Sequence, residues 1–326
     1  LLVRFIKIKK KKTRKRKINF SNLNFKIRNK KIIKLLNFRN QHIRYELENL
    51  IDQKKQYMQL FDIKKPLKFF LNNSRGINKY LIEFAKKEKI FCFLVSHGTL
   101  SYQKNYYGKL YNDAIAEEVV EKTAYNCAQT ELAYSYLKNI TKKKNILKTG
   151  NLIFSSGISK GRKNFLYAVT SRDFNNTHFF GIETFYEFFD NLKFLNNYSK
   201  KNNLKIIVKL HPGVMYLNKE LSHFFKDLYF STDDIKKLLE NSKAVISFSS
   251  TVIEDALNLK IPVILLDRWK RYNHFSQVNF IKKTKIKNYI NNEKELDNII
   301  KNFGIFKKKI LYKKVISEKN PFDNFK

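Results

Sequence analysis

Three short polar motifs directly follow apolar runs of the sequence, and their residue types suit catalysis on a phosphate-bearing substrate. The motifs are His97-Gly98-Thr99, His211-Pro212 and Ser249-Ser250-Thr251. A histidine has an ordinary pKa of about 6.5 and exchanges a proton near neutral pH. Hydroxyl and backbone N–H groups at the start of a helix bind anions. Together the motifs predict a site that removes a proton from one substrate and holds the phosphates of another.

The two histidines have different expected roles. Gly98 lets the chain turn sharply after His97, so His97-Gly98-Thr99 is interpreted as an acceptor loop in which His97 is the candidate base. Pro212 ends the strand after His211 and holds the imidazole at the sheet edge, where it could donate to a leaving phosphate. A structural role stays open for each: a loop residue bonded to a carbonyl for His97, and a simple strand end for His211.

Ser249, Ser250 and Thr251 stand between an apolar strand and an apolar-faced helix, where they are expected to bind a donor's phosphates. Open α/β sheets bind ligands at this edge. A second interpretation of the same turn is a capping box, in which Thr251 caps the helix and the carboxylate of Glu254 folds back to the cap. The residues alone leave both interpretations open.

No metal and no separate cofactor are predicted. The adjacent acids Glu117-Glu118, Asp233-Asp234 and Glu254-Asp255 diverge by about 100° on a helix, so none forms a convincing metal pair. The two cysteines, Cys92 and Cys127, lie in separate apolar runs, and neither their number nor their spacing indicates a disulfide framework or a metal cluster. They favour a reducing compartment.

The elements that must position these motifs alternate between strand and helix, which predicts an α/β fold of two Rossmann-like domains facing a cleft. We divide the chain into a basic arm with an amphipathic helix (1–60), an acceptor domain (61–160) and a donor domain (161–326), joined by a linker at 155–164. Predicted strands cover residues 66–73, 90–96, 125–129, 147–155 (broken at Gly150), 165–171, 204–210, 228–230, 244–246 and 261–266. Predicted helices cover residues 31–60 (as one or two helices), 77–89, 113–122, 131–139, 182–198, 217–226, 233–241 and 252–259. Thr130 is expected to cap the helix over 131–139.

Two details of this assignment concern the second half of the chain. Ser231 or Thr232 is expected to cap the helix over 233–241, because a hydroxyl residue before an acidic first turn is a typical helix start. Beyond Trp269 the chain is basic, and we expect it to be mostly helical.

The chain is strongly basic, with a formal net charge of +38. Residues 1–40 hold sixteen Lys or Arg and no Asp or Glu, so they are expected to form a solvated arm. Nucleic acid, an anionic membrane surface or an acidic polymer could bind it, although a compositional bias toward Lys, Asn and Ile explains the charge equally well. No apolar run reaches about 18 residues. We expect a cytoplasmic protein, peripheral at the inner face of the membrane.

Two segments of the second half resemble the C-terminal donor domain of GT-B fold transferases that build bacterial surface polysaccharides. They are KIIVKLHPG (205–213) and KKLLENSKAVISFSSTVIEDALNLKIPVILLD (236–267). The pattern is most similar to the CDP-glycerol glycerophosphotransferases and to the polysialyltransferase and capsule transferase groups. The resemblance implies that His211, Ser249 and Ser250 hold the donor's phosphates. It also favours a ribose contact over the capping role for Glu254.

The first half resembles these enzymes through FLVSHGTLS (93–101), which is similar to the strand that they place across the cleft from the donor. The resemblance implies that His97 faces the donor as the base or positions the acceptor. The chain departs from the pattern at two places. Ser247-Phe248 stands where Asp-Tyr is usual, and Glu254 stands where Asp is usual, so the donor need not be CDP-glycerol.

The expected function is therefore transfer of a sugar or glycerol phosphate from a nucleotide-activated donor to a hydroxyl of a polysaccharide or lipid-linked acceptor, without a metal. Three alternatives stay open. A UDP-sugar 2-epimerase shares the fold, a nucleic-acid or membrane-binding protein would use the basic arm, and an inactive relative would only tether polysaccharide. No nucleic-acid recognition motif is present, so specific nucleic-acid binding is not expected.

Overall fold

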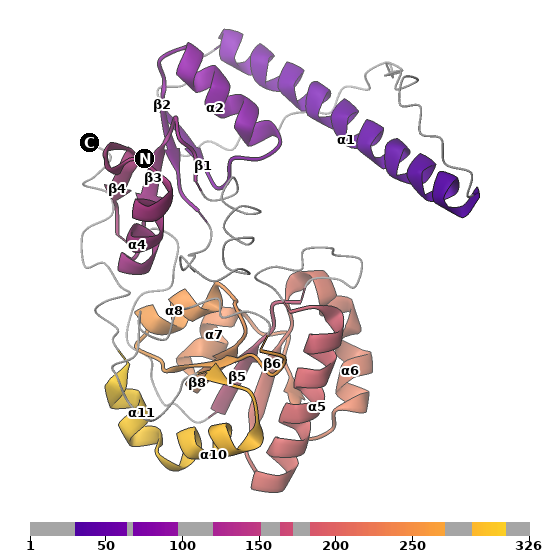
Figure 1. The fold of residues 1–326 in the computed structure, drawn as a ribbon, viewed down its shortest axis with the longest axis vertical. Helices are drawn as coiled ribbons and strands as arrows, with labels where there is room; N and C mark the ends of the chain where they lie inside the picture. The colour runs from indigo at the N-terminus through magenta and orange to yellow at the C-terminus, as the bar shows by residue number, and fades with distance from the viewer. Residues whose placement is uncertain are drawn as a thin grey trace.

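Two parallel β-sheets, each flanked by helices, form the two halves of the computed structural model (Figure 1). The structure describes residues 30–63, 68–96, 120–150, 164–171, 183–270 and 289–310. Every strand pair within these ranges is parallel. The expected α/β fold of two Rossmann-like domains is confirmed.

The first sheet has the strand order β1-β2-β3-β4. Its strands are β1 (Lys68–Leu71), β2 (Phe91–Leu94), β3 (Tyr125–Ala128) and β4 (Ile146–Lys148). Helix α2 (Ile77–Lys87) connects β1 to β2, and α4 (Glu131–Ile140) with the 3-10 turn η1 (Lys143–Asn145) connects β3 to β4. Helix α4 begins at the expected cap, because the Thr130 hydroxyl accepts a hydrogen bond from the Ala133 N–H at 3.1 Å.

The second sheet has the order β10-β9-β8-β5-β6-β7. Its strands are β5 (Asn164–Ala168), β6 (Ile206–Lys209), β7 (Tyr229–Phe230), β8 (Ser242–Ser247), β9 (Val263–Leu266) and β10 (Tyr289–Ile290). The chain runs from β5 outward to β7 and then returns to β8, on the other side of β5. This reversal makes the carboxyl ends of β5 and β8 a topological switch point, where open α/β sheets bind ligands.

Helices cover both faces of the second sheet. They are α5 (Phe185–Asn202), the 3-10 turn η2 (Pro212–Leu217), α6 (Asn218–Phe224), α7 (Ile235–Glu240), α8 (Val252–Asn258), α10 (Glu293–Lys301) and α11 (Phe303–Lys309). Because helices cover both faces of the sheet, the inner strands are apolar in their central residues. All of Val263–Leu266 and of Ala244–Ile246 is fully buried, as the sequence predicted for the central strand-helix-strand unit.

The structure corrects two details of the sequence assignment and agrees with a third. The helix over 235–240 is capped by Asp234, whose carboxylate accepts the Lys236 N–H at 2.8 Å, and not by Ser231 or Thr232. Strand β4 ends at Lys148, just before the predicted break at Gly150, where φ is 75°. The region beyond Trp269 also contains the strand β10, which extends the sheet beside β9. The basic residues 1–29, most of the helix predicted over 113–122 and nearly all of the expected linker lie outside the described residues.

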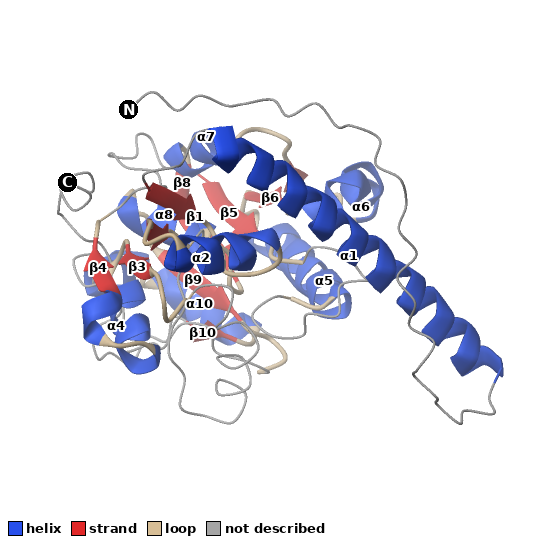
Figure 2. Cartoon of the chain, turned by 90° about the horizontal axis from the view of Figure 1, so that it is seen from above, coloured by secondary structure: helices blue, strands red, loops and turns tan. Residues whose placement is uncertain are grey.

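Helix α1 (Lys30–Ile63) is one continuous amphipathic helix, where the sequence predicted one or two. Its C-terminal part packs on the first domain, where Phe61 stacks on Phe84 with ring centroids 5.0 Å apart. The preceding turns extend away from both domains (Figure 2), and there Phe38 and Tyr45 are exposed. No helix in the described ranges is long and apolar enough to cross a membrane.

Both cysteines are free and buried in the first sheet. Burial raises the pKa of the Cys92 thiol to about 11 and that of Cys127 to about 12. Both therefore stay protonated at neutral pH, and a protonated thiol is a poor nucleophile and metal ligand.

Candidate active site

The candidate site lies at the carboxyl ends of β6, β5 and β8. His211 follows β6 by two residues, and the Ser249–Thr251 turn follows β8. Strand β5 lies between them, with Ala168 opposite both Lys209 of β6 and Ser247 of β8. Adjacent strands are about 4.8 Å apart, so β6 and β8 are separated by about 10 Å. The structure thus brings His211 and the serine turn to one edge of one sheet.

Serine hydroxyls fix the shape of the turn after β8. The Ser247 hydroxyl donates to the Ala168 carbonyl of β5 at 2.8 Å and accepts the Ser250 N–H at 3.2 Å. The Ser250 hydroxyl accepts the Val252 N–H at 3.2 Å, at the first residue of α8. The turn Ser249–Thr251 is itself half-buried to exposed. It is therefore anchored to the sheet while its outer groups face solvent.

The capping box considered for the start of α8 does not form. Thr251 has helical φ and ψ of −59° and −20° and makes no side-chain cap hydrogen bond. Ser250 takes that role instead, because its hydroxyl accepts the Val252 N–H. Glu254, one turn into α8, is buried with 1% of its surface exposed. The capping interpretation is therefore wrong, and the ribose role of Glu254 stays a prediction.

His211 is oriented by its own backbone. Its Nδ1 accepts the Gly213 N–H at 3.0 Å, and Pro212 occupies the first position of the η2 turn. Because Nδ1 is the acceptor, the neutral ring carries its proton on Nε2. The imidazole can therefore donate from Nε2 to an anionic oxygen, which is the chemistry predicted for it.

The acceptor loop His97-Gly98-Thr99 lies outside the described residues. The strand that leads to it is β2, and the chain after β2 is held by the Gln129 amide, which donates to the Ser96 carbonyl at 2.8 Å. Val95 donates its N–H to the Leu71 carbonyl at 2.7 Å. His97 therefore directly follows a chain segment that is fixed on both sides, and its role stays a prediction.

The two sheets meet through their carboxyl ends. Phe248 directly follows β8, is 3% exposed, and packs in one apolar cluster with Val120, Ala128, Tyr136 and Leu137 of the first domain. Ala128 is the last residue of β3. Figure 1 accordingly shows α8 on the side of the second domain that is nearest to α4. The candidate site thus lies where the two domains touch.

Sequence reasoning missed a third group at this edge, which follows β5. The buried carboxylate of Glu183 accepts hydrogen bonds from the Thr170 N–H at 2.9 Å and the Thr170 hydroxyl at 3.0 Å. The Asn191 amide at 2.8 Å and the Tyr167 hydroxyl donate to the same carboxylate. Burial raises the pKa of Glu183, and these hydrogen bonds oppose that shift. The cluster fixes the end of β5 between the two predicted groups.

Ser171 is the next residue after this cluster. It is 1% exposed, and its Oγ makes no hydrogen bond in the described part of the chain. A buried hydroxyl without a partner costs about 1–3 kcal/mol, so its presence calls for an explanation such as a ligand contact. A sequence signal existed: Thr170-Ser171 follows an apolar run in the same way as Ser249-Ser250 does.

Two Rossmann-like domains that meet at their carboxyl edges, with His211 and the serine turn on the second, form a two-domain protein of GT-B-like architecture. Residues 69–305 match the family CDP-Glycerol:Poly(glycerophosphate) glycerophosphotransferase. The match covers nearly all of both sheets, and the chain belongs to this family. It is therefore a transferase that uses a nucleotide-activated donor. A comparison with curated proteins finds no significant match.

Solved structures share the fold at low sequence identity. UDP-GlcNAc 2-epimerase of Methanocaldococcus jannaschii superposes with a TM-score of 0.51 and 18% identity over 85% of this chain and 77% of that chain. The Neisseria meningitidis enzyme gives 0.51 and 14% over 85% and 78%. The wall teichoic acid polymerase TagF gives 0.43 and 13% over 89% and 93%. At these identities the similarity to the epimerases shows a shared fold only and does not extend to their reaction.

Proposed function

We propose that this chain transfers glycerol phosphate from CDP-glycerol to a growing poly(glycerophosphate) chain. One observation carries the proposal: in a member of this family, His211 and the Ser249–Thr251 turn stand on the two strands that flank β5, at the switch point of the second sheet. A donor diphosphate at that point would meet both groups at once.

In the proposed reaction an acceptor hydroxyl oxygen attacks the phosphorus that carries the glycerol. A P–O bond to the acceptor forms, the P–O bond to CMP breaks, and the hydroxyl proton passes to His97. CMP leaves with the bonding electron pair, so negative charge develops on its phosphate. His211 Nε2–H and the groups of the Ser249–Thr251 turn stabilise that charge. Ser171 supplies a further hydroxyl at the end of β5, and Glu254 binds the ribose.

The direct test is transfer of labelled glycerol phosphate to a poly(glycerophosphate) acceptor, with CMP release measured in parallel. The proposal expects equal amounts of CMP and transferred label with CDP-glycerol. Because Ser247-Phe248 and Glu254 depart from the family pattern, donors activated with UDP, GDP and CMP are tested beside CDP-glycerol. If transfer to the acceptor occurs only with another donor, that donor takes the place of CDP-glycerol in the proposal. Conversion of UDP-GlcNAc without any acceptor would indicate epimerisation instead.

His97→Ala is expected to reduce transfer by about 10²–10⁴-fold, because the acceptor hydroxyl loses its base. Nucleotide affinity should stay close to that of the wild type, since the donor is bound by the second domain. Ser250→Ala is the matched comparison and should weaken nucleotide binding, whereas Ser250→Thr keeps a hydroxyl and much of the affinity. Calorimetric titration with CDP measures binding, and normal turnover in His97→Ala would remove the base from the proposal.

The basic N-terminus suggests where the reaction takes place. We propose that residues 1–40 hold the enzyme peripherally at the inner, anionic face of the cytoplasmic membrane, where each basic residue contributes roughly 1 kcal/mol. Deletion of residues 1–40 should then abolish co-sedimentation with anionic vesicles and leave transfer to a soluble acceptor intact. Undiminished vesicle binding by the shortened chain would contradict this location, and retained binding to duplex or single-stranded nucleic acid would revive that alternative.

A further inference from the structure

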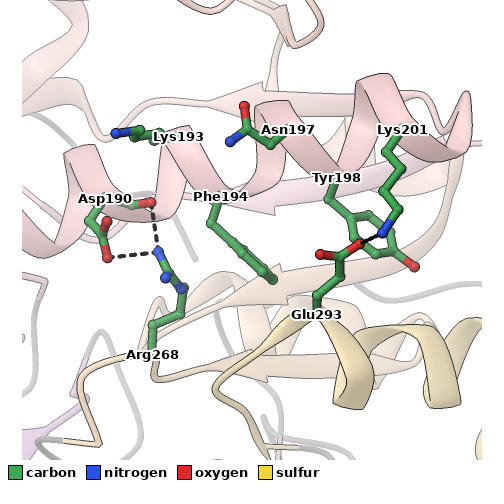
Figure 3. Close-up of a pocket in the computed structure, with 8 residues that line it drawn as sticks. All are labelled: Asp190, Lys193, Phe194, Asn197, Tyr198, Lys201, Arg268 and Glu293. Carbon is green, nitrogen blue, oxygen red and sulfur yellow. Dashed lines mark hydrogen bonds and ion pairs between the residues drawn. The ribbon is translucent and has the colours of Figure 1, made fainter.

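A groove that the proposed reaction does not use runs along the exposed side of α5. It consists of two adjoining depressions of about 630 and 350 Å³ that share Asp190 and Lys193 in their walls. The first is lined mainly by aromatic rings, and the second, drawn in Figure 3, mainly by polar side chains. From Phe185 to Lys201 the helix advances about 24 Å. A groove of this length suits an extended chain better than a single small molecule.

The aromatic end of the groove is exposed, and a hydrogen bond holds the tryptophan at its edge. Tyr186, Phe189 and Trp269 are 76%, 41% and 52% exposed. The Asp190 carboxylate accepts hydrogen bonds from the Trp269 indole N–H at 3.1 Å and from the Arg268 guanidinium at 2.7 Å. The guanidinium also lies 4.6 Å from the centroid of the Phe194 ring. The indole is thus preorganised on the surface, which lowers the entropic cost of binding a ligand.

The charges of the groove leave a cation available. Its two carboxylates are already paired, Asp190 with Arg268 and Glu293 with Lys201 at 2.5 Å (Figure 3). Lys193 borders both depressions near Asp190 and has no carboxylate within ion-pair distance among the described residues. A ligand in the groove would therefore meet one unpaired positive charge beside the neutralised pairs, which favours an anionic ligand.

The aromatic end of the groove lies at the sheet edge that carries the candidate donor site. Phe185 comes two residues after Glu183, which binds the end of β5. Trp269 comes three residues after the end of β9, and β9 pairs with β8, whose end carries the serine turn. Figure 1 shows α5 running from this edge down the second domain. The groove therefore starts beside the donor site and leads away from it.

We propose that this groove binds the acceptor polymer behind its reactive end, with polymer phosphates near Lys193 and the polyol carbons against Phe189 and Trp269. The chemical class is a linear polyol phosphate, and its identity rests on the proposed function. Repeated negative charges separated by short polyol units, whose C–H groups can pack on aromatic rings, match an unpaired lysine next to a row of aromatic rings. Such a contact strengthens with the number of polymer units that reach the groove.

Trp269 is the only tryptophan of the chain, so its fluorescence reports binding directly. Titration of the full chain with long poly(glycerophosphate) should give a saturable change in fluorescence. An acceptor of only two glycerophosphate units should bind at least about tenfold more weakly. Lys193→Glu is expected to raise the Kd for the long polymer at least about fivefold, or roughly 1 kcal/mol. Lys200→Glu makes the same charge change on the same helix outside the groove and should alter the Kd less than about twofold.

The aromatic contribution is tested in the same way. Phe189→Ala should raise the Kd for the long polymer, whereas Phe224→Ala, which removes a 70% exposed ring from α6, should not. In transfer assays Phe189→Ala and Lys193→Glu should raise the KM for long acceptors much more than the KM for short ones. Because the fluorescence titration needs no turnover, it separates failure of this proposal from failure of the proposed reaction.

Three results would overturn the proposal. The fluorescence of Trp269 could fail to respond to the long polymer, the Lys193 and Lys200 variants could weaken binding equally, or the KM for long and short acceptors could rise by the same factor. A binding experiment with anionic vesicles that carry no polymer tests whether the groove contacts a membrane instead. If Lys193→Glu and Phe189→Ala lose vesicle binding while polymer binding is unchanged, the groove is a membrane contact and not an acceptor site.

Discussion

Phe248→Ala is expected to lower the free energy of unfolding by about 3–5 kcal/mol, the usual cost of removing a buried phenylalanine ring. The ring is 3% exposed and fills the contact between the two domains, packed with Val120, Ala128, Tyr136 and Leu137. Its loss leaves a cavity that neither domain can close alone. Denaturant unfolding followed by circular dichroism measures the change. We expect one unfolding transition for the wild type and two for Phe248→Ala, one for each domain.

Two further variants make this result specific. Phe248→Leu keeps most of the buried volume and should recover most of the lost stability. Phe224→Ala removes an exposed ring and should stay within about 0.5 kcal/mol of the wild type. A Phe248→Ala protein that is as stable as Phe224→Ala would contradict the packing of the two domains through this residue.

His211→Ala is expected to reduce transfer about 10²–10³-fold, the range found when one donor to a developing negative charge is removed. The alanine also removes the acceptor of the Gly213 N–H, which lies 3.0 Å from Nδ1. Loss of such a cap costs about 1 kcal/mol of stability. The expected result is therefore a large loss of turnover together with a small loss of stability, measured by CMP release and thermal unfolding.

His211→Asn separates these two effects. The amide oxygen of asparagine can accept the Gly213 N–H as Nδ1 does, so stability should return close to the wild-type value. Asparagine has no group in the place of Nε2–H, so turnover should stay as low as in His211→Ala. Recovery of turnover in His211→Asn would assign His211 a structural role only, which is the alternative that the sequence left open.

Local sequence signals predicted the elements that form from their own residues. The apolar run of residues 261–266 predicted a buried strand, which forms over Val263–Leu266. Thr130 caps α4 because its hydroxyl meets an N–H three residues ahead. Strand β10 was missed because two residues, Tyr289 and Ile290, carry no periodic pattern and become a strand only by pairing with β9. The serine turn and the segments around it resemble known transferases closely enough that the sequence alone indicates the family.

The site was predictable only where its residues stand directly after strands. His211 and Ser249–Thr251 met that condition, and the sheet order then placed them on either side of β5. The contact of Glu183 with Thr170 joins residues 13 positions apart through side chains, so no periodicity reveals it. The capping box at Thr251 was wrong because Ser250, one residue earlier, receives the helix N–H first.

The apolar contact around Phe248 has a consequence for chimeras. A donor half taken from another member of the family would bring its own residue at this position into a socket formed by Val120, Ala128, Tyr136 and Leu137. Donor and acceptor specificity could then be combined by exchanging halves, but only between family members in which the side chain at position 248 matches the volume of the cavity that receives it. Compatibility of the two halves thus depends on the side chain at position 248, directly before the Ser249–Thr251 turn.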